Sequence, residues 1–180
     1  QLFDIGRTYT YTVGGVQKKW QPKNYGGNFQ GIVSLRDSLV QSRNLSTLNL
    51  VTDVGVNTTT DDLKRYGFKD IVDNLSVTLG SMSVNLIEFS QAYTIFSNNG
   101  VQVKPYIVEQ IVNKDGKSVT FEPQRKELNP PEQSYLITSI LKDVVTKGTG
   151  RRAAVDGIEL AGKTGTTNDN IDAWFCGYSP

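Results

Sequence analysis

Two short polar runs, Ser42-Arg43-Asn44 and Lys163-Thr164-Gly165-Thr166, contain the side chains best suited to chemistry in this 180-residue chain. A serine hydroxyl donates and accepts hydrogen bonds, so Ser42 could relay a proton, and a neighbouring cation would help it to release that proton. The amide of Asn44 could fix an amide group of a substrate. Because the chain has no histidine, any proton shuttle must be a lysine, a carboxylate, a tyrosine or a water.

Each run also has an ordinary structural interpretation when it is taken alone. Serine and asparagine are frequent helix caps, so the first run could simply begin a helix. Lys163 could be a surface lysine on a strand. Neither run therefore predicts a function without the other and without the sequence around both.

The composition excludes several classes of function. A net charge of +1 supplies no basic field for a phosphate backbone, so we expect no nucleic-acid partner. The single cysteine, Cys176, excludes an internal disulfide and a multi-cysteine zinc site. With histidine also absent, we expect no metal site and no cofactor. No run of residues approaches the roughly 18 apolar residues that a membrane span needs.

The first polar run lies between two predicted helices. Ser34, with Asp37 three residues later, has the form of a capping box and predicts a helix that ends near Gln41. A second helix is predicted over residues 45–51, with an end near Gly55. The run at 42–44 is therefore expected at a junction between two helices.

Two further helices follow. Ser83 is the predicted cap of the first, which ends at Asn98-Asn99-Gly100, and the second begins after Pro130-Pro131 and reaches about Lys147. At 100° per residue the later helix has one apolar half, which we expect to be buried. Its members are Leu136, Ile137, Ile140, Leu141, Val144 and Val145.

Strands are predicted in the remaining segments. Asp115-Gly116 between two β-rich runs predicts a hairpin over residues 106–121. Residues 158–166 and 172–178 predict a second pair of strands, with turn formers at Asn168-Asp169-Asn170 between them. The first 30 residues are expected to form extended segments and turns. The fold class is therefore α+β, an antiparallel sheet flanked by helices.

Two other motifs match by letter and are rejected on their context. Residues 157–164 fit the phosphate-loop pattern G-x-x-x-x-G-K-[ST], which would make the chain a nucleotide-binding protein. That loop needs a helix that begins at the lysine, whereas residues 158–161 alternate as a strand does. Ser139 and Lys142 form the one S-x-x-K of the sequence. They lie on the predicted polar face of their helix, so a solvated surface explains them.

The remaining runs resemble the S-x-N and K-T-G motifs of penicillin-binding proteins and serine β-lactamases, with Arg43 at the position where that motif set has Asp. The flanking sequence resembles the class A, bifunctional branch of the penicillin-binding proteins, and the resemblance covers nearly all 180 residues. It includes the runs at 20–25, 31–36, 92–100, 148–150 and 172–175.

This resemblance implies a role for each motif residue. Ser42, Asn44 and Lys163 would be catalytic, and Thr164, Gly165 and Thr166 would hold the carboxylate of a substrate or of a β-lactam. The backbone N–H of Thr166 would be one donor to the oxyanion. The family places its S-x-x-K ahead of S-x-N, and nothing before Ser42 supplies one.

Residues 1–180 are therefore expected to be an incomplete β-lactamase/transpeptidase-like domain, with the nucleophile-bearing segment and the C-terminal end of the domain elsewhere in the same parent protein. The resemblance implies a DD-transpeptidase that acts on peptidoglycan stem peptides, is acylated by β-lactam antibiotics and lies on the outer face of the cytoplasmic membrane or in the periplasm. The chain by itself is expected to be inactive. The alternatives are a DD-carboxypeptidase, a β-lactamase, a non-catalytic β-lactam sensor and the disfavoured nucleotide-binding protein.

Overall fold

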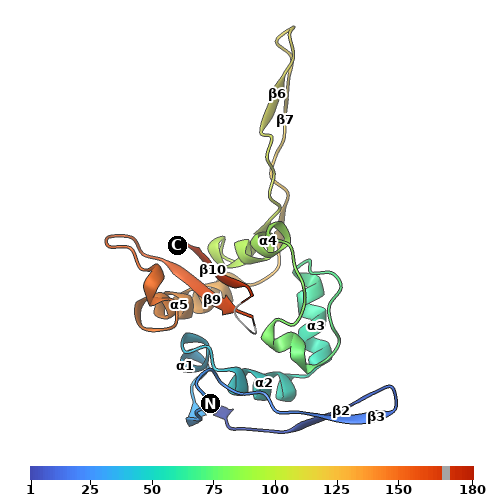
Figure 1. Cartoon of the computed structure of the whole chain (residues 1–180). Coiled ribbons are helices and arrows are strands. Elements are labelled where there is room, and N and C mark those ends of the chain that lie inside the picture. Colours follow the sequence, from blue (N-terminus) through green and yellow to red (C-terminus); the bar gives the residue numbers. More distant parts are fainter. Residues whose placement is uncertain (168–170) are drawn as a thin grey trace.

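The computed structural model describes residues 1–167 and 171–180. Helices and antiparallel strand pairs mix along the described chain, so the α+β class is confirmed (Figure 1). The α-helices are α1 (Leu35–Val40), α2 (Asn44–Val54), α3 (Val56–Arg65), α4 (Leu86–Ser97) and α5 (Pro131–Lys147). Two 3₁₀ helices are η1 (Leu75–Leu79) and η2 (Arg151–Ala153).

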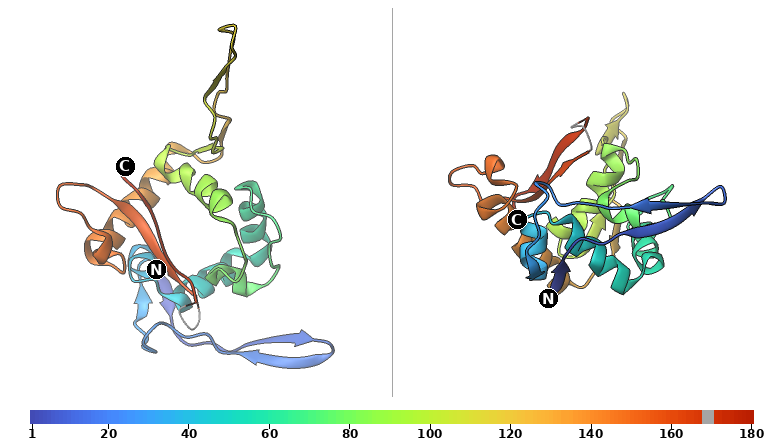
Figure 2. Two further views of the ribbon diagram at one scale, coloured as in Figure 1. Left: turned by 45° about the horizontal axis from the view of Figure 1, so that its top comes forward. Right: turned by 60° about the horizontal axis from the view of Figure 1, so that its bottom comes forward.

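The strands of the described residues pair two by two. The pairs are β1 (Leu2–Asp4) with β4 (Gly31–Val33), β2 (Tyr9–Val13) with β3 (Val16–Trp20), β5 (Val101–Val103) with β8 (Arg125–Glu127), β6 (Gln110–Val112) with β7 (Ser118–Thr120), and β9 (Ala161–Thr166) with β10 (Ala173–Tyr178). The pairs β2–β3 and β6–β7 extend away from the helices as arms (Figure 2).

The Ser34 cap predicted before α1 is confirmed, and the Asp37 carboxylate accepts from the Ser34 hydroxyl at 2.7 Å. The Ser34 hydroxyl accepts a hydrogen bond from the Asp37 N–H at 2.9 Å, which satisfies an N–H of the first helical turn. At α2 the capping interpretation of the first polar run is wrong, because the N-cap residue is Arg43 and its side chain makes no capping bond. The first turn of α2 depends on more distant partners.

Three local expectations need correction. The cap of α4 is Asn85 rather than Ser83, and its side chain accepts from the Glu88 N–H at 2.9 Å. The helix α3 was not predicted, because threonine-rich residues 56–60 carry little helical propensity. The β2–β3 arm was also not predicted, although Gly14-Gly15 supplies its turn at positive φ.

The helix α5 is the central support of the described structure. Its residues Ile140, Leu141 and Val144 form a buried cluster with Val40 of α1 and Ala161 of β9. The expected apolar half is wrong at its N-terminal end, since Leu136 is 58% exposed. Ser134 and Thr138 are buried instead, and the Thr138 hydroxyl donates to the Phe96 carbonyl of α4 at 3.2 Å.

The predicted antiparallel pairing of the two C-terminal strands is confirmed, with Lys163 opposite Cys176 and Thr166 opposite Ala173. The first of these strands begins at residue 161 rather than 158. The turn predicted at Asn168-Asp169-Asn170 lies outside the described residues. No helix within the described residues has both the length and the apolar character needed to cross a membrane.

Candidate active site

The buried cluster on α5 positions both polar runs. Val40 lies two residues before Ser42, and Ala161 lies two residues before Lys163 on the same face of β9. Both residues pack into the cluster around Val144. The end of α1 and the middle of β9 are therefore held side by side, although 121 positions of sequence separate Ser42 from Lys163.

The two motifs meet through one direct hydrogen bond. The Lys163 ammonium donates to the Ser42 hydroxyl at 2.8 Å and to the main-chain carbonyl of Thr164 at 2.9 Å. A charge-assisted donor of this kind stabilises negative charge that develops on a serine oxygen. The arrangement can therefore lower the cost of moving a proton through Ser42.

The environment of Lys163 changes its acid–base behaviour. Burial lowers the pKa of its ammonium from 10.5 to about 8, because the charged form loses hydration. The two acceptors that it contacts are both uncharged. Lys163 is therefore mostly an ammonium at neutral pH and becomes a neutral amine at mildly alkaline pH.

Ser42 has an unusual backbone. Its φ of 54° lies in the left-handed region, which costs a residue with a Cβ about 1–3 kcal/mol. The Ser42 N–H donates to the Leu39 carbonyl at 3.2 Å, and the Arg43 N–H donates to the Ser38 carbonyl at 2.9 Å. These two bonds end α1 and turn the chain sharply into α2. The turn carries the Ser42 hydroxyl that meets Lys163.

Asn44, the third residue of the first run, lies in the first turn of α2. Its side-chain N–H donates to the Lys23 carbonyl at 2.9 Å, so the loop before β4 orients the amide. An amide has two N–H donors and one carbonyl acceptor, so this bond leaves capacity for a ligand. The structure thus places Asn44 beside the Ser42 turn without a contact to Lys163.

The threonines and the glycine of the second run lie toward the exposed end of β9. Thr164 exchanges a hydrogen bond with Thr149 between their hydroxyls at 2.8 Å. Gly165 and Thr166 are exposed, and a Cβ added at Gly165 would meet no atom within 4 Å. Thr149 was not among the predicted site residues. The motif at 148–150 pointed to its turn but assigned its side chain no role.

In the structure the two residues of the S-x-x-K match have different partners. The Ser139 hydroxyl accepts from the Arg36 guanidinium at 3.0 Å, and Lys142 forms an ion pair with Glu159. Lys163, the lysine of the phosphate-loop match, lies within β9, and no helix begins there. A phosphate loop needs a helix at this lysine, so the nucleotide-binding interpretation is wrong.

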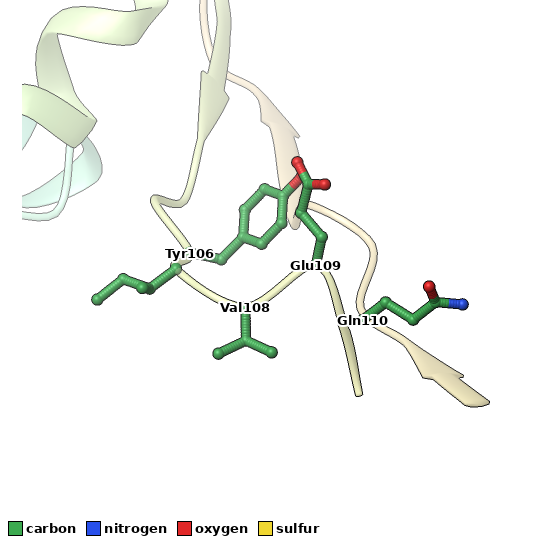
Figure 3. A pocket seen from close by; sticks show the side chains of 5 residues that line it. Tyr106, Val108, Glu109 and Gln110 are labelled. Atoms are coloured by element: carbon green, nitrogen blue, oxygen red, sulfur yellow. The ribbon is translucent and has the colours of Figure 1, made fainter. Parts of the chain in front are cut away.

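An open hollow of about 640 Å³ lies elsewhere, along the five consecutive residues 106–110. Tyr106 and Glu109 line one side of it, and Val108 points to the other (Figure 3). These residues form the base of the β6–β7 arm, which extends away from β9 (Figure 1). The lining is one continuous segment, of which only Gln110 lies in a strand, and the hollow has no part in the Ser42–Lys163 site.

Comparison with known proteins agrees with this fold. The family model "Penicillin binding protein transpeptidase domain" matches residues 6–180. "Penicillin-binding protein 1A" of Neisseria gonorrhoeae is 35% identical over 170 residues, which cover 89% of this chain and 21% of that protein. The chain thus spans about a fifth of the length of the curated relatives that it matches.

Solved structures have the same fold. The crystal structure of penicillin-binding protein 1A from Haemophilus influenzae superposes with a TM-score of 0.87 at 27% identity, over 98% of this chain and 32% of that one. The imipenem acyl-enzyme complex of penicillin-binding protein A from M. tuberculosis has the same fold, with a TM-score of 0.78 at 19% identity over 100% of this chain and 46% of that one.

The fold and these similarities place the chain among the domains of penicillin-binding proteins. Within them, it belongs to the penicillin-binding protein transpeptidase domain family.

Proposed function

We propose that this chain is part of a peptidoglycan DD-transpeptidase, which cross-links stem peptides through a serine acyl-enzyme and is acylated by β-lactams. The observation that carries the proposal is the 2.8 Å hydrogen bond between Lys163 and Ser42, which joins the two motifs into one site. Membership of the transpeptidase domain family and the similarity to penicillin-binding protein 1A support it.

In the proposed reaction a serine of the parent protein attacks the carbonyl carbon of the D-Ala-D-Ala bond. The C–N bond breaks, the leaving D-Ala nitrogen takes up a proton through Ser42, and an ester to the serine remains. The amine of a second stem peptide then attacks this ester, forms the cross-link and frees the serine. The oxyanion forms once in each half of the reaction and needs stabilisation both times.

The residues of this chain supply the recognition and the proton transfer. The Thr164 and Thr166 hydroxyls bind the terminal carboxylate of the substrate, with the positive charge of Lys163 nearby. The backbone N–H of Thr166 donates to the oxyanion, and the Asn44 amide holds an amide of the substrate. Ser42 and Lys163 form the proton path to the leaving group.

The nucleophile is assigned to an S-x-x-K segment of the same parent protein outside these 180 residues. Ser139 and Lys142 do not form that pair, because Ser139 contacts Arg36 of α1 and Lys142 contacts Glu159, which precedes β9. The parent protein is placed on the outer face of the cytoplasmic membrane or in the periplasm, where stem peptides are cross-linked. We expect no cofactor, no metal and no nucleic acid to take part.

The test uses the full-length parent protein and a fluorescent penicillin. We expect a stoichiometric covalent adduct, and with stem pentapeptide substrate we expect cross-linked dimer rather than free tetrapeptide. Free tetrapeptide would make the protein a carboxypeptidase, and rapid release of hydrolysed penicillin would make it a β-lactamase. An adduct without product from any stem peptide would leave a β-lactam sensor. Absence of any adduct contradicts the proposal altogether.

A further inference from the structure

Asp4, at the end of β1, is a completely buried carboxylate outside both motifs. One of its oxygens accepts from the Asn24 side-chain N–H at 2.7 Å, and the other accepts from the Gln30 main-chain N–H at 2.9 Å. The Arg43 guanidinium lies 3.6 Å from the second oxygen. A buried carboxylate is stable only with such partners, so Asp4 is tied to two other parts of the chain.

Arg43, the middle residue of the first motif, is also buried, with 8% of its surface exposed. Its guanidinium donates to Asn28 at 2.7 Å and, through two of its nitrogens, to the side-chain oxygen of Gln41 at 3.0 and 3.2 Å. Gln41 precedes Ser42 and Arg43 follows it. Two side-chain hydrogen bonds therefore join the residues on either side of Ser42.

Asn24 connects the same carboxylate to the start of α2. Its side-chain carbonyl accepts from the Leu45 N–H at 3.1 Å, and its N–H group donates to Asp4 and to the Asn28 carbonyl. The first turn of α2 has no local cap, so this residue from 21 positions earlier satisfies one of its free N–H groups. Asp4 thus fixes α2 through Asn24 and the Ser42 turn through Arg43.

The strained backbone of Ser42 needs support from the hydrogen bonds around Asp4. A serine at φ 54° persists only where the surrounding structure determines it more strongly than its own preference. One side of the turn is held by the end of α1, and the other side is held by the groups around Asp4. If the second side is released, Ser42 can relax to negative φ, and its hydroxyl then turns away from the Lys163 ammonium.

We propose that Asp4 is a positioning residue, which holds the strained Ser42 turn through Arg43 and Asn24 so that the Ser42 hydroxyl meets Lys163. The inference rests on the proposed role of Ser42 in proton transfer. Asp4 itself touches neither the substrate nor the reacting atoms. Its effect is on the geometry of Ser42, so it acts on the rate of acylation rather than on the binding of the carboxylate by Thr164 and Thr166.

The experiment measures acylation of the full-length parent protein by a fluorescent penicillin, well below the melting temperature of each variant. In Asp4→Asn, which keeps the shape and removes the charge, we expect an acylation rate constant at least tenfold lower. The dissociation constant of the non-covalent complex and the number of reactive sites per molecule should not change. A purely structural role would instead lower the number of reactive sites and leave the rate constant of the folded molecules unchanged, which would overturn the proposal.

Asp143→Asn is the matched control. Asp143 lies on α5, where it forms ion pairs with Arg36 of α1 and with Lys147 of its own helix. We expect this variant to lower the melting temperature without slowing acylation.

If Asp4→Asn does not fold, Arg43→Lys tests the proposal instead, since it keeps the buried charges balanced and loses the two-nitrogen contact with Gln41. A rate reduced at least threefold supports the proposal, and a wild-type rate overturns it. A wild-type parent that forms no adduct would contradict the proposed function instead.

Discussion

The Lys163 ammonium and the Ser42 hydroxyl are joined by a 2.8 Å hydrogen bond, in which the lysine donates. The direction of this bond matters, because an ammonium cannot accept the proton of a serine. At neutral pH the pair is therefore set up to stabilise charge on the Ser42 oxygen and to pass a proton onward. Ser42 is not set up to become a nucleophile of its own.

Replacing Lys163 by Ala in the full-length parent protein should slow acylation by a β-lactam strongly. Loss of proton-transfer catalysis typically costs a factor of about 10² to 10⁴ in rate. The melting temperature should change little, because Lys163 is only half-buried and its ammonium already loses hydration in the folded state. The second-order acylation constant and a thermal melt test the two effects separately.

Lys163→Arg is the control for charge. It should restore only part of the rate, since a planar guanidinium cannot occupy the position of a compact ammonium beside Ser42. Acylation of Lys163→Ala at the parental rate would show that Lys163 is an ordinary surface lysine. The assignment of this motif to the active site would then be wrong.

The lowered pKa of Lys163 predicts the pH dependence of the reaction. With a pKa of about 8, the ammonium is lost as the pH rises through 8, so the acylation rate should fall across pH 7.5 to 9. In Lys163→Arg this fall should be absent, because the guanidinium stays protonated. A wild-type rate that remains level to pH 10 would show that the ammonium is not required.

The same shift predicts how stability depends on pH. Between about pH 8 and 10.5 the unfolded chain holds a proton on Lys163 that the folded chain has lost. The free energy of unfolding therefore gains a contribution as the pH rises through this window, and below pH 8 the contribution is constant. Denaturant melts should show this gain in the wild type relative to Lys163→Ala. Parallel pH curves for the two proteins would contradict it.

Much of the fold could be predicted from local sequence signals. Pattern and propensity were sufficient for the Ser34 cap before α1, the Asp-Gly hairpin and the limits of α5, because each depends on residues close together in the chain. The exposure of Leu136 was missed because periodicity gives the apolar face of an isolated helix. It does not say which part of that face another element covers.

Only part of the site could be predicted from the sequence. The two motifs were identified through their resemblance to a known family, and the structure brings Ser42 and Lys163 into contact. The network around Asp4 gave no signal, because a lone aspartate in an extended segment has no local pattern that predicts burial. Its partners lie 20 to 39 positions away and become evident only when β1, the following loop and α2 are in place.

Gly165→Ala and Gly162→Ala should have opposite effects, although both glycines lie on β9. A Cβ at Gly165 meets nothing within 4 Å, so the fold should tolerate alanine, and its free energy of unfolding should stay within about 1 kcal/mol of the wild type. Acylation should nevertheless slow, because the methyl group lies where a substrate would pair with the strand. Wild-type acylation by Gly165→Ala would count against substrate binding along β9.

A Cβ at Gly162 would contact the Phe175 ring and lie 2.7 Å from the Cys176 carbonyl oxygen of β10. Forcing extra volume into such a contact typically costs about 1–3 kcal/mol. Gly162→Ala should therefore lower the stability measured by denaturant, whereas the surviving folded fraction should be acylated at a rate close to the wild type. Equal stability of the two variants would show that the β9–β10 contact adapts easily.

Two partly buried tyrosines predict contrasting effects of losing a hydroxyl. The Tyr93 hydroxyl is buried without a hydrogen-bond partner among the described residues, and burial raises the pKa of its phenol. Tyr93→Phe should therefore leave the protein as stable as the wild type or more stable. The Tyr178 hydroxyl shares a 2.6 Å hydrogen bond with Thr138, so Tyr178→Phe should cost about 1 kcal/mol. Thermal melts of the two variants that shift equally would refute this difference.

The isolated 180 residues should form no covalent adduct with penicillin. Of the two serines considered, Ser42 accepts a hydrogen bond from Lys163, which is mostly protonated at pH 7 and so cannot act as its base. Ser139 accepts from the Arg36 guanidinium, which has no acceptor for the serine proton, while Lys142 forms an ion pair with Glu159. Intact-mass spectrometry after incubation with a β-lactam at pH 7 measures the outcome, with the full-length parent protein as the positive control. An adduct on Ser42 or Ser139 would show that the chain carries its own nucleophile, and the assignment of that serine to another segment of the parent protein would then be wrong.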